Sequence, residues 1–326
     1  MSVEDSYIYY YTGTTRCHAH ERLAADQLPP TSVVQLKHPV RLASAVLVGL
    51  VALAVLYSMA TNENFQWGRV WFYLFDPQIM AGLRSTLILT VSAMSMGLVL
   101  GVVLATCRIS RNPVLSTVAG VYLWFFRGTP LLIQLIFWFN FAALYPRLSL
   151  SVPFGGPEIV GASTNEVLTV WFVALLGLTL NEAAYMAEII RGGLLAVPKH
   201  QTEAAQALGM SPLMLFRRIV LPQALRVIIP PTGNQVIGML KYSSLVSIIA
   251  LPDLLYSAQL IYSQNFETIP LLIVVSFWYL LCTSILTVAQ RRVERHYGRG
   301  TPGAPAPRTP GSLRRRIAGT TQGGTR

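Results

Sequence analysis

The chain has 326 residues, of which 53% are hydrophobic and only 12% are charged, and its mean hydropathy is +0.50. A soluble domain carries about 25% charged residues, so this composition excludes an ordinary soluble fold and predicts a membrane protein. The formal net charge of +11 could indicate nucleic-acid binding. The basic residues, however, gather between apolar segments, which argues against nucleic acid and for contact with lipid head groups.

Six apolar segments have the length of a membrane span. A hydrocarbon core about 30 Å thick is crossed by roughly 20 apolar residues in a helix. The segments are residues 42–60, 83–106, 129–145, 167–190, 227–251 and 269–289. The start of the third is ambiguous, because its apolar run already begins near Val114. The first is too long for the core of a signal peptide, so we predict that it is retained as a span.

The distribution of basic residues predicts the orientation of these spans. With the N-terminus in the cytoplasm, the external segments contain only Arg69, Arg84 and Arg147 among the Lys and Arg residues, and Lys241 lies inside a span. The positive-inside rule therefore places both termini in the cytoplasm. No cysteine is then external, so we predict no disulfide framework.

The ends of the chain and the longest external loop differ in composition from the spans. Residues 1–40 and 296–326 are polar or rich in Gly, Pro and Arg, which predicts disordered cytoplasmic tails around one membrane domain, 41–295. The stretch "CHAH" at 17–20 could bind a metal ion, but no second ligand cluster accompanies it, so we predict no metal site. Loop 146–166 is either a plain connector or a surface for an external partner.

One amphipathic stretch, "EAAQALGMSPLMLFRRIVLP" (residues 203–222), lies between the fourth and fifth spans. Residues 201–208 favour a helix, and Gly209 is the expected left-handed residue at its end. Ser211 then begins a second short helix with Pro212 in its first turn, and Leu221–Pro222 is expected to end it. The pattern predicts a helix–turn–helix on the cytoplasmic face, either resting on lipid or contacting a partner.

Several motifs are missing from the sequence. It has no phosphate-binding loop G-x-x-x-x-G-K-[ST], no H-E-x-x-H and no G-x-S-x-G. The chain therefore does not bind ATP phosphates in the usual way, and we predict that it is not an enzyme.

The amphipathic stretch at residues 203–222 resembles the EAA motif of ATP-binding-cassette importer permeases. Segments within about residues 80–295 resemble the polar amino acid subfamily of these permeases. The resemblance rests on "GLRSTLILTVSA", "YLWFFRGTPLLIQL" and "LPQALRVIIPPTGNQVIGMLK" as well as on the EAA stretch. It implies an all-α fold: the five-helix core of type I importer permeases (MetI-like), here with an extra N-terminal span. His200, and Tyr242-Ser243 within "KYSSLVSIIALPDLL", depart from the usual family pattern.

The resemblance also implies partners and a docking segment. Separate ATPase subunits, which hold ATP and Mg, would dock on the EAA loop (about 199–222), an external amino-acid-binding protein would deliver substrate, and the permease would form a homodimer or heterodimer in the bacterial inner membrane. The residues expected to couple to the ATPase are Glu203, Ala204, Ala205, Gly209, Leu213, Phe216, Ile219, Leu221 and Pro222.

Ionisable side chains inside spans are costly and therefore candidates for a substrate path. Glu182 and Lys241 either pair with each other or with neighbouring groups, or they contact the ammonium and carboxylate of an amino acid. Asn181, Gln134 and Asn234 are further candidates, although polar side chains also join helices.

Other charged residues in or near the spans have simpler explanations. Glu188 and Arg191 have the i,i+3 spacing of an ion pair. Arg127 precedes a helix start at Thr129–Pro130, where it could reach the head groups or act in gating.

The predicted function is import of a polar amino acid or a similar small zwitterion. The alternative is an ion-coupled secondary transporter, for which inverted repeats and relays of ionisable residues would be expected.

Overall fold

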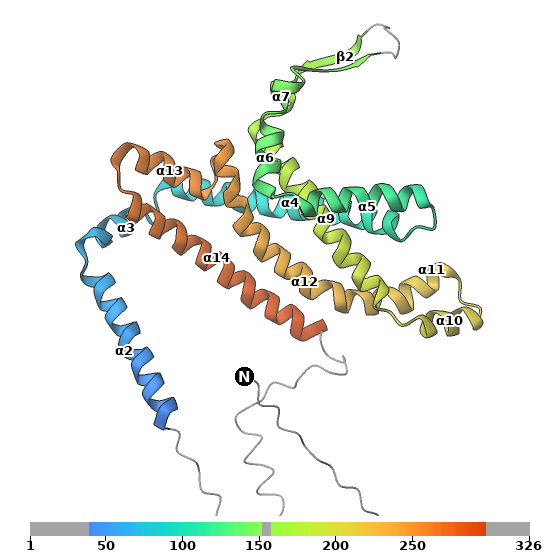
Figure 1. The fold of residues 1–326 in the computed structure, drawn as a ribbon, viewed down its shortest axis with the longest axis horizontal. Coiled ribbons are helices and arrows are strands. Elements are labelled where there is room, and N and C mark those ends of the chain that lie inside the picture. The colour runs from blue at the N-terminus through green and yellow to red at the C-terminus, as the bar shows by residue number, and fades with distance from the viewer. Residues whose placement is uncertain (1–38, 152–157, 298–326) are drawn as a thin grey trace, which may run out of the picture. The chain divides into compact units, whose positions relative to one another are not determined.

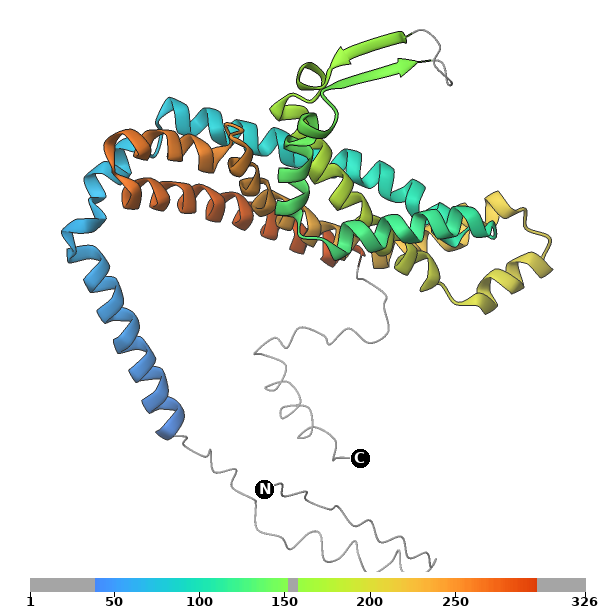
Figure 2. The ribbon, with the colours of Figure 1, turned by 45° about the horizontal axis from the view of Figure 1, so that its top comes forward.

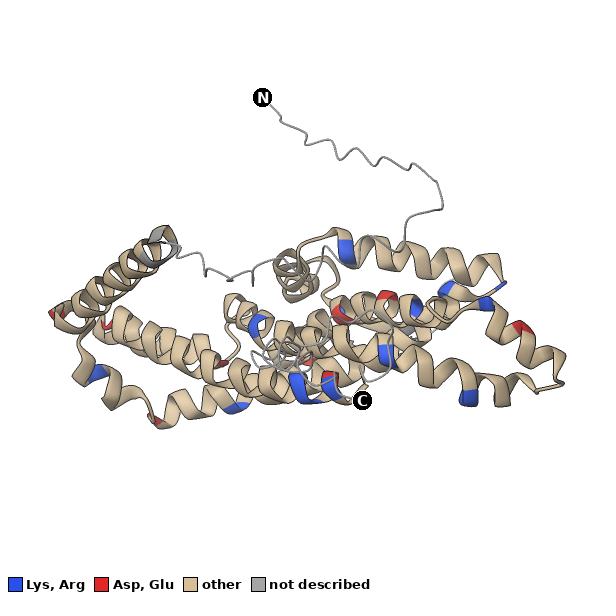
Figure 3. Ribbon diagram, turned by 90° about the horizontal axis from the view of Figure 1, so that it is seen from below, with Lys and Arg blue, Asp and Glu red and all other residues tan. Residues whose placement is uncertain are grey.

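The computed structural model describes residues 39–151 and 158–297, and nearly all of them are helical. The chain divides into two units, residues 1–62 and 63–326, which are described separately. The stretch "CHAH" at 17–20, for which no metal site was predicted, and most of both predicted tails lie outside the described residues. Charged residues are sparse along the helices (Figure 3).

The first unit contains one described helix, α2 (Pro39–Thr61). The side chains described for it are exposed, and its apolar window, Ala43–Thr61, has a mean hydropathy of 2.2. A helix that is apolar on all sides needs an apolar environment. Its length matches the 42–60 span predicted from the sequence.

The second unit is a bundle of long helices with shorter helices at their ends (Figure 1). The long helices are α4 (Pro77–Ile109), α5 (Pro113–Gly128), α9 (Val170–Leu195), α12 (Leu221–Tyr242) and α14 (Thr268–Tyr297). Helix α9 lies against α4, α5 and α12, and α12 also contacts α14. The main core is formed by apolar side chains of these helices, including Leu89, Leu178 and Met186.

Glycines on α4 allow it to approach α9 closely. A Cβ atom on Gly101 would lie 2.7 Å from Cβ of Met186, and one on Gly97 would lie 2.9 Å from Cγ of Glu182. Small residues at such positions are how membrane helices obtain close packing. The contact fixes which face of α9 is turned away from α4.

Four of the described helices, α2, α4, α9 and α14, are each long and apolar enough to cross a membrane. Two further spans are possible if each of two bent pairs counts as one, which gives up to six in the described chain. The first pair, α5 with α6 (Leu131–Phe139), bends by 101°, and the second is the 212–249 stretch with α13 (Leu254–Asn265), at 44°.

The third predicted span, 129–145, was wrong as a single straight helix. The chain instead forms α5, breaks at Thr129–Pro130 and continues as α6, followed by the short α7 (Phe141–Leu144). Thr129 is extended, with φ −110° and ψ 141°, because a residue before proline is sterically excluded from the helical region. The predicted helix start at Thr129–Pro130 is confirmed.

The fifth predicted span, 227–251, also needs correction. Helix α12 starts earlier, at Leu221, and ends at Tyr242, where the 3₁₀ segment η4 (Ser243–Ile249) replaces it. Ala250 then takes a left-handed φ of 59° before α13 begins. The apolar run could not reveal this change, because hydropathy does not distinguish a 3₁₀ turn from an α-helix.

An antiparallel hairpin lies beyond the end of α6. Strand β1 (Arg147–Ser151) pairs with β2 (Glu158–Ser163), with Arg147 opposite Ser163 and an irregularity at Leu150/Ser151. Figures 1 and 2 both show the hairpin extending away from the helices, and the short α8 (Thr164–Val167) leads from it into α9. The predicted 146–166 loop therefore contains regular structure, which its Pro and Gly content did not indicate.

An ion pair joins α3 (Trp67–Tyr73), which follows the short η2 (Glu63–Phe65), to the start of α14. Arg69 contacts the carboxylate of Glu267, and Asn265 donates a 2.9 Å hydrogen bond to the Tyr73 hydroxyl. The hydrogen bond from Arg69 lowers the pKa of Glu267 below its usual value, although partial burial opposes this effect.

We expect Glu267→Gln to cause a small loss of thermal stability that depends on pH. Because the pKa is lowered in the folded protein, the stabilisation is present above the usual glutamate pKa and is lost as pH falls through the lowered value. Thermal melts of both proteins should therefore differ near pH 7 and converge in acid. A difference that persists in acid would show that the ion pair is not its source.

Candidate functional site

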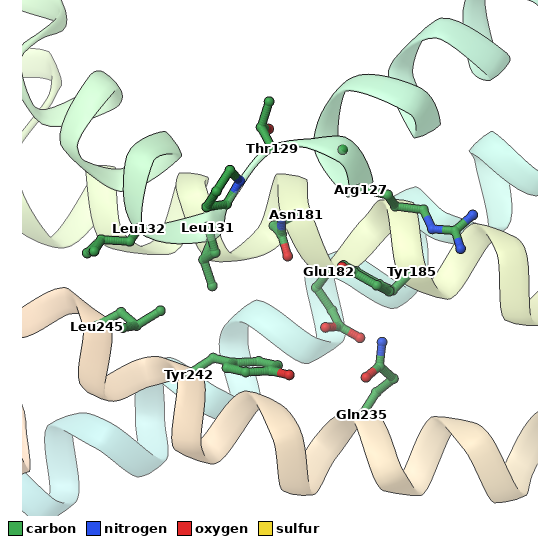
Figure 4. Close-up of a pocket in the computed structure, with 12 residues that line it drawn as sticks. Arg127, Thr129, Leu131, Leu132, Asn181, Glu182, Tyr185, Gln235, Tyr242 and Leu245 are labelled. Carbon is green, nitrogen blue, oxygen red and sulfur yellow. The ribbon is translucent and has the colours of Figure 1, made fainter.

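A cavity of about 530 Å³ opens between three segments that are far apart in the sequence (Figure 4). The residues that line it come mainly from the α5–α6 break, α9 and α12. They include Thr129, Pro130, Asn181, Glu182, Tyr185, Gln235 and Tyr242. The cavity combines apolar walls with a few polar groups, as small-molecule sites usually do.

Glu182 is the notable group in this cavity. Its side chain is only 2% exposed, and among the described residues its Oε1 atom has no hydrogen-bond partner. The α4 backbone at Gly97 is packed behind it, and in Figure 4 its carboxyl group points toward the amide of Gln235. A buried carboxyl without a partner is costly, so this arrangement suits a group that a ligand completes.

Asn181 and Gln134 are brought together, but they hold the helix break. Gln134 donates from Nε2 to the carbonyl of Phe126 (3.1 Å) and to Oγ1 of Thr129 (2.7 Å). Asn181 donates from Nδ2 to the same Phe126 carbonyl (3.0 Å) and to Oε1 of Gln134 (3.2 Å). These bonds satisfy carbonyl groups freed where α5 ends, while Asn181 also lines the cavity.

We expect Gln134→Ala to lower the free energy of unfolding by about 1–3 kcal/mol, because it removes the side-chain hydrogen bonds to the Phe126 carbonyl and Thr129 and the one from the Asn181 amide. Chemical or thermal unfolding in detergent would measure the effect. Gln206→Ala, at an exposed position on another helix, is the matched control and should have little effect. Equal stabilities of the two variants would contradict a clamping role.

Lys241 and Asn234 do not join the cavity. Both side chains are exposed, neither lines the cavity, and no ion pair connects Lys241 with Glu182 among the described residues. The two charges therefore do not neutralise each other in this structure. Packing between the helices determines which side of α12 faces α9. The hydropathy pattern of the sequence did not predict this side.

Three cavity residues were missed from the sequence. Tyr185 lies one helical turn after Glu182, and Gln235 and Tyr242 are spaced i,i+7 on α12, so they share one face. These spacings were available as a signal, but ordinary tyrosines and glutamines do not stand out in an apolar helix. In contrast, the predicted Glu188–Arg191 ion pair is confirmed, with Arg191 Nη2 at 2.7 Å from Glu188 Oε2.

At the other end of α9 lies the segment that joins it to α12, which we call the coupling segment (residues 199–222). Helix α10 (Lys199–Ala207) ends at Gly209, whose φ is +75°. The amides of Gly209 and Met210 donate to the carbonyls of Gln206 and Ala205, which is the Schellman arrangement. The predicted left-handed glycine is thus confirmed.

The second half of the coupling segment differs from the prediction. Ser211 caps α11 (Pro212–Leu215) as expected, accepting from the Met214 amide. The helix does not end at Leu221–Pro222, because the chain continues through a π-helical turn, η3 (Phe216–Val220), directly into α12. Pro222 falls in the first turn of α12, where its missing amide hydrogen is tolerated.

The coupling segment presents apolar side chains to its surroundings. Leu208 is 84% exposed, Leu213 66% and Phe216 41%, while Ala205 and Leu215 are buried. Glu203 and Ala204 are exposed on α10, Pro222 is exposed, and Ile219 and Leu221 are half-buried. Of the nine residues predicted for docking, most are therefore accessible on one end of the bundle.

These features define a class of protein: a helical membrane protein with a cavity that combines apolar walls and a few polar groups, and with an exposed segment at the end of α9 that can take a partner. Residues 97–299 match the family described as "Binding-protein-dependent transport system inner membrane component". The chain belongs to this family of permease subunits.

Individual relatives agree with this assignment. The chain is 45% identical to the arginine transport system permease protein ArgU of Corynebacterium glutamicum over 84% of this chain and 85% of that one. It is 36% identical to the nopaline transport system permease protein NocM of Agrobacterium fabrum, over 65% and 84% of the two chains. A solved amino acid ABC transporter structure aligns with a TM-score of 0.58 and 32% identity, covering 68% of this chain and 95% of that chain.

Three predictions are thereby confirmed: the type I ATP-binding-cassette importer permease, its all-α fold and its role as a non-catalytic subunit whose ATPase is a separate chain. The ion-coupled alternative is not favoured by any of these similarities.

Proposed function

We propose that this chain forms the translocation path of an ATP-driven importer for a polar amino acid. Permeases similar to it include subunits of transport systems named for arginine and nopaline. The observation that carries the proposal is Oε1 of Glu182, which is buried and has no hydrogen-bond partner among the described residues, at a cavity large enough for a small molecule. An ammonium or other cationic group of the substrate would complete that oxygen's bonding.

The substrate carboxylate would be bound without Lys241, in contrast to one expectation from the sequence. Lys241 is exposed outside the cavity, whereas Gln235 and Tyr242 line it and carry neutral N–H and O–H donors. We therefore assign Glu182, Gln235 and Tyr242 to the substrate path. Asn181 and Gln134 support the path by holding the break between α5 and α6.

The coupling segment, in our proposal, docks on a separate ATPase subunit that holds ATP and Mg. Its exposed leucines and Glu203 lie beyond the C-terminal end of α9, whereas the hairpin precedes the N-terminal end of that helix. Helix α9 has 26 residues and is about 40 Å long, so the two features lie on opposite sides of a bilayer. In this proposal the distribution of basic residues puts both termini in the cytoplasm of a bacterial cell, and the hairpin would face an external amino-acid-binding protein.

We further propose a dimer, with a second copy or a related permease, in the inner membrane. Among the described residues no cluster of His, Cys, Asp or Glu suitable for a metal ion occurs.

The test is uptake of labelled amino acids by the complete complex, with its ATPase and binding protein, in proteoliposomes. Uptake should require ATP on the side of the membrane where the ATPase subunits are bound. It should continue after the proton gradient has been collapsed. Uptake that persists without ATP and stops with the gradient would overturn the proposal.

A further inference from the structure

A second cavity, of about 460 Å³, lies among the end of α4, α5 and α9. It is lined by Arg108, Gly120, Leu123, Trp124, Arg127, Gly128, Tyr185 and Glu188. It shares Arg127 and Tyr185 with the substrate cavity, but in Figure 4 the Arg127 side chain extends away from Glu182. The proposed transport path uses neither Arg108 nor Trp124.

The charge of this second cavity is positive. Glu188 is already paired with Arg191 at 2.7 Å, and Arg127 lies 3.9 Å from the same carboxylate oxygen. Arg108 is held by a 2.9 Å hydrogen bond from its Nη1 to Oγ of Ser116. Two guanidinium groups from different helices therefore face a cavity with one carboxylate that a third arginine already neutralises, which favours an anion.

The surface beside the cavity is apolar. Val114, Val118, Val121 and Trp124 on α5 are exposed, Trp124 by 75%, and their spacing places them on one helix face. An exposed row of this kind beside a cationic pocket fits a molecule with an anionic head and apolar chains. Tryptophan at such a boundary is typical of the bilayer interface.

Gly120 lines the cavity beside Arg108. A Cβ atom there would make only ordinary contact with Arg108, at 3.5 Å from Cζ. A methyl group would therefore fit, whereas a larger side chain would project into the cavity.

We propose that this cavity binds the phosphate head group of an anionic glycerophospholipid, whose acyl chains lie along the exposed face of α5. Basic pockets between membrane helices bind acidic lipid head groups by the same chemistry. The site contains none of the three residues assigned to the substrate path, although it borders the substrate cavity at Arg127 and Tyr185, and it adds a lipid requirement to the transporter. The inference concerns residues on this chain alone and does not depend on the transported substrate.

The experiment is native mass spectrometry of the complete transporter complex titrated with short-chain phosphatidylglycerol, phosphatidylcholine or inorganic phosphate. We expect saturable binding of phosphatidylglycerol only. Arg108→Gln and Arg127→Gln should each weaken it about fivefold, the equivalent of about 1 kcal/mol per basic group. Gly120→Leu should weaken it without any change of charge, and Gly120→Ala should bind normally.

The matched control is Arg292→Gln, which removes the same single charge from an exposed position near the end of α14 and should retain binding. Equal losses in this control would show general attraction to charge and overturn the site. Binding of inorganic phosphate with equal affinity would overturn the lipid assignment. A further test is disulfide cross-linking of the Trp124→Cys variant in a background without native cysteines. Cross-linking of two copies would show that the exposed face of α5 is a protein interface and would overturn the proposal.

Discussion

Replacing Glu182 with glutamine is expected to reduce ATP-driven uptake by about 10- to 100-fold. The substitution keeps the shape of the side chain but removes a charge-assisted hydrogen bond to the substrate, which is worth about 1.5–3 kcal/mol. The apparent affinity for substrate should weaken, while the amount of complex in the membrane stays normal. Uptake by the complete complex in proteoliposomes measures the apparent affinity, and quantitative immunoblotting measures the amount of complex in the membrane.

Stability separates this role from a structural one. Because Oε1 of Glu182 has no partner among the described residues, a neutral amide should not destabilise the protein, and the unfolding temperature should be unchanged or higher. Lys241→Gln is the control, since Lys241 is exposed outside the cavity. The double variant should show the sum of the single effects. Normal uptake with a clearly lower unfolding temperature in Glu182→Gln would reject the binding role.

The sequence was informative wherever local chemistry decides the structure. Long apolar runs located the spans, and the Gly209 and Ser211 positions specified the turn of the coupling segment because left-handed backbone and helix capping depend on the residue itself. The i,i+3 spacing of Glu188 and Arg191 likewise sufficed for an ion pair on one helix.

The sequence was not informative where distant segments decide. The apolar run extends on both sides of the 101° bend at Thr129–Pro130. The sequence therefore indicated a helix start there, but not that α5, before the bend, and α6, after it, form one bent pair. The direction in which the Glu182 side chain points depends on how α9 is rotated about its axis where it packs against Gly97 of α4. The direction of the Lys241 side chain depends in the same way on the rotation of α12. Neither rotation is visible in composition, so a pair of opposite charges within two spans was a poor guide to contact.

The coupling segment yields the second large expected effect: Gly209→Asp should abolish transport and the stimulation of ATP hydrolysis by the binding protein. The φ of +75° at Gly209 costs an L-residue about 1–2 kcal/mol, so the turn would shift and α10 would lose its position relative to α11. The free ATPase should hydrolyse ATP normally. Stimulated hydrolysis at the normal rate, with normal protein levels, would refute the assignment.

Contact can be separated from geometry within the same segment. Leu213 is 66% exposed on α11, and full burial of a leucine side chain contributes about 1.5–3 kcal/mol. We therefore expect Leu213→Ser to weaken ATPase association by about 30-fold or more, measured by co-purification over a dilution series. Leu144→Ser, at a 62% exposed position on α7, is the matched control. If Glu203→Lys abolishes association while Leu213→Ser does not, the docking contact lies on α10 and not on α11.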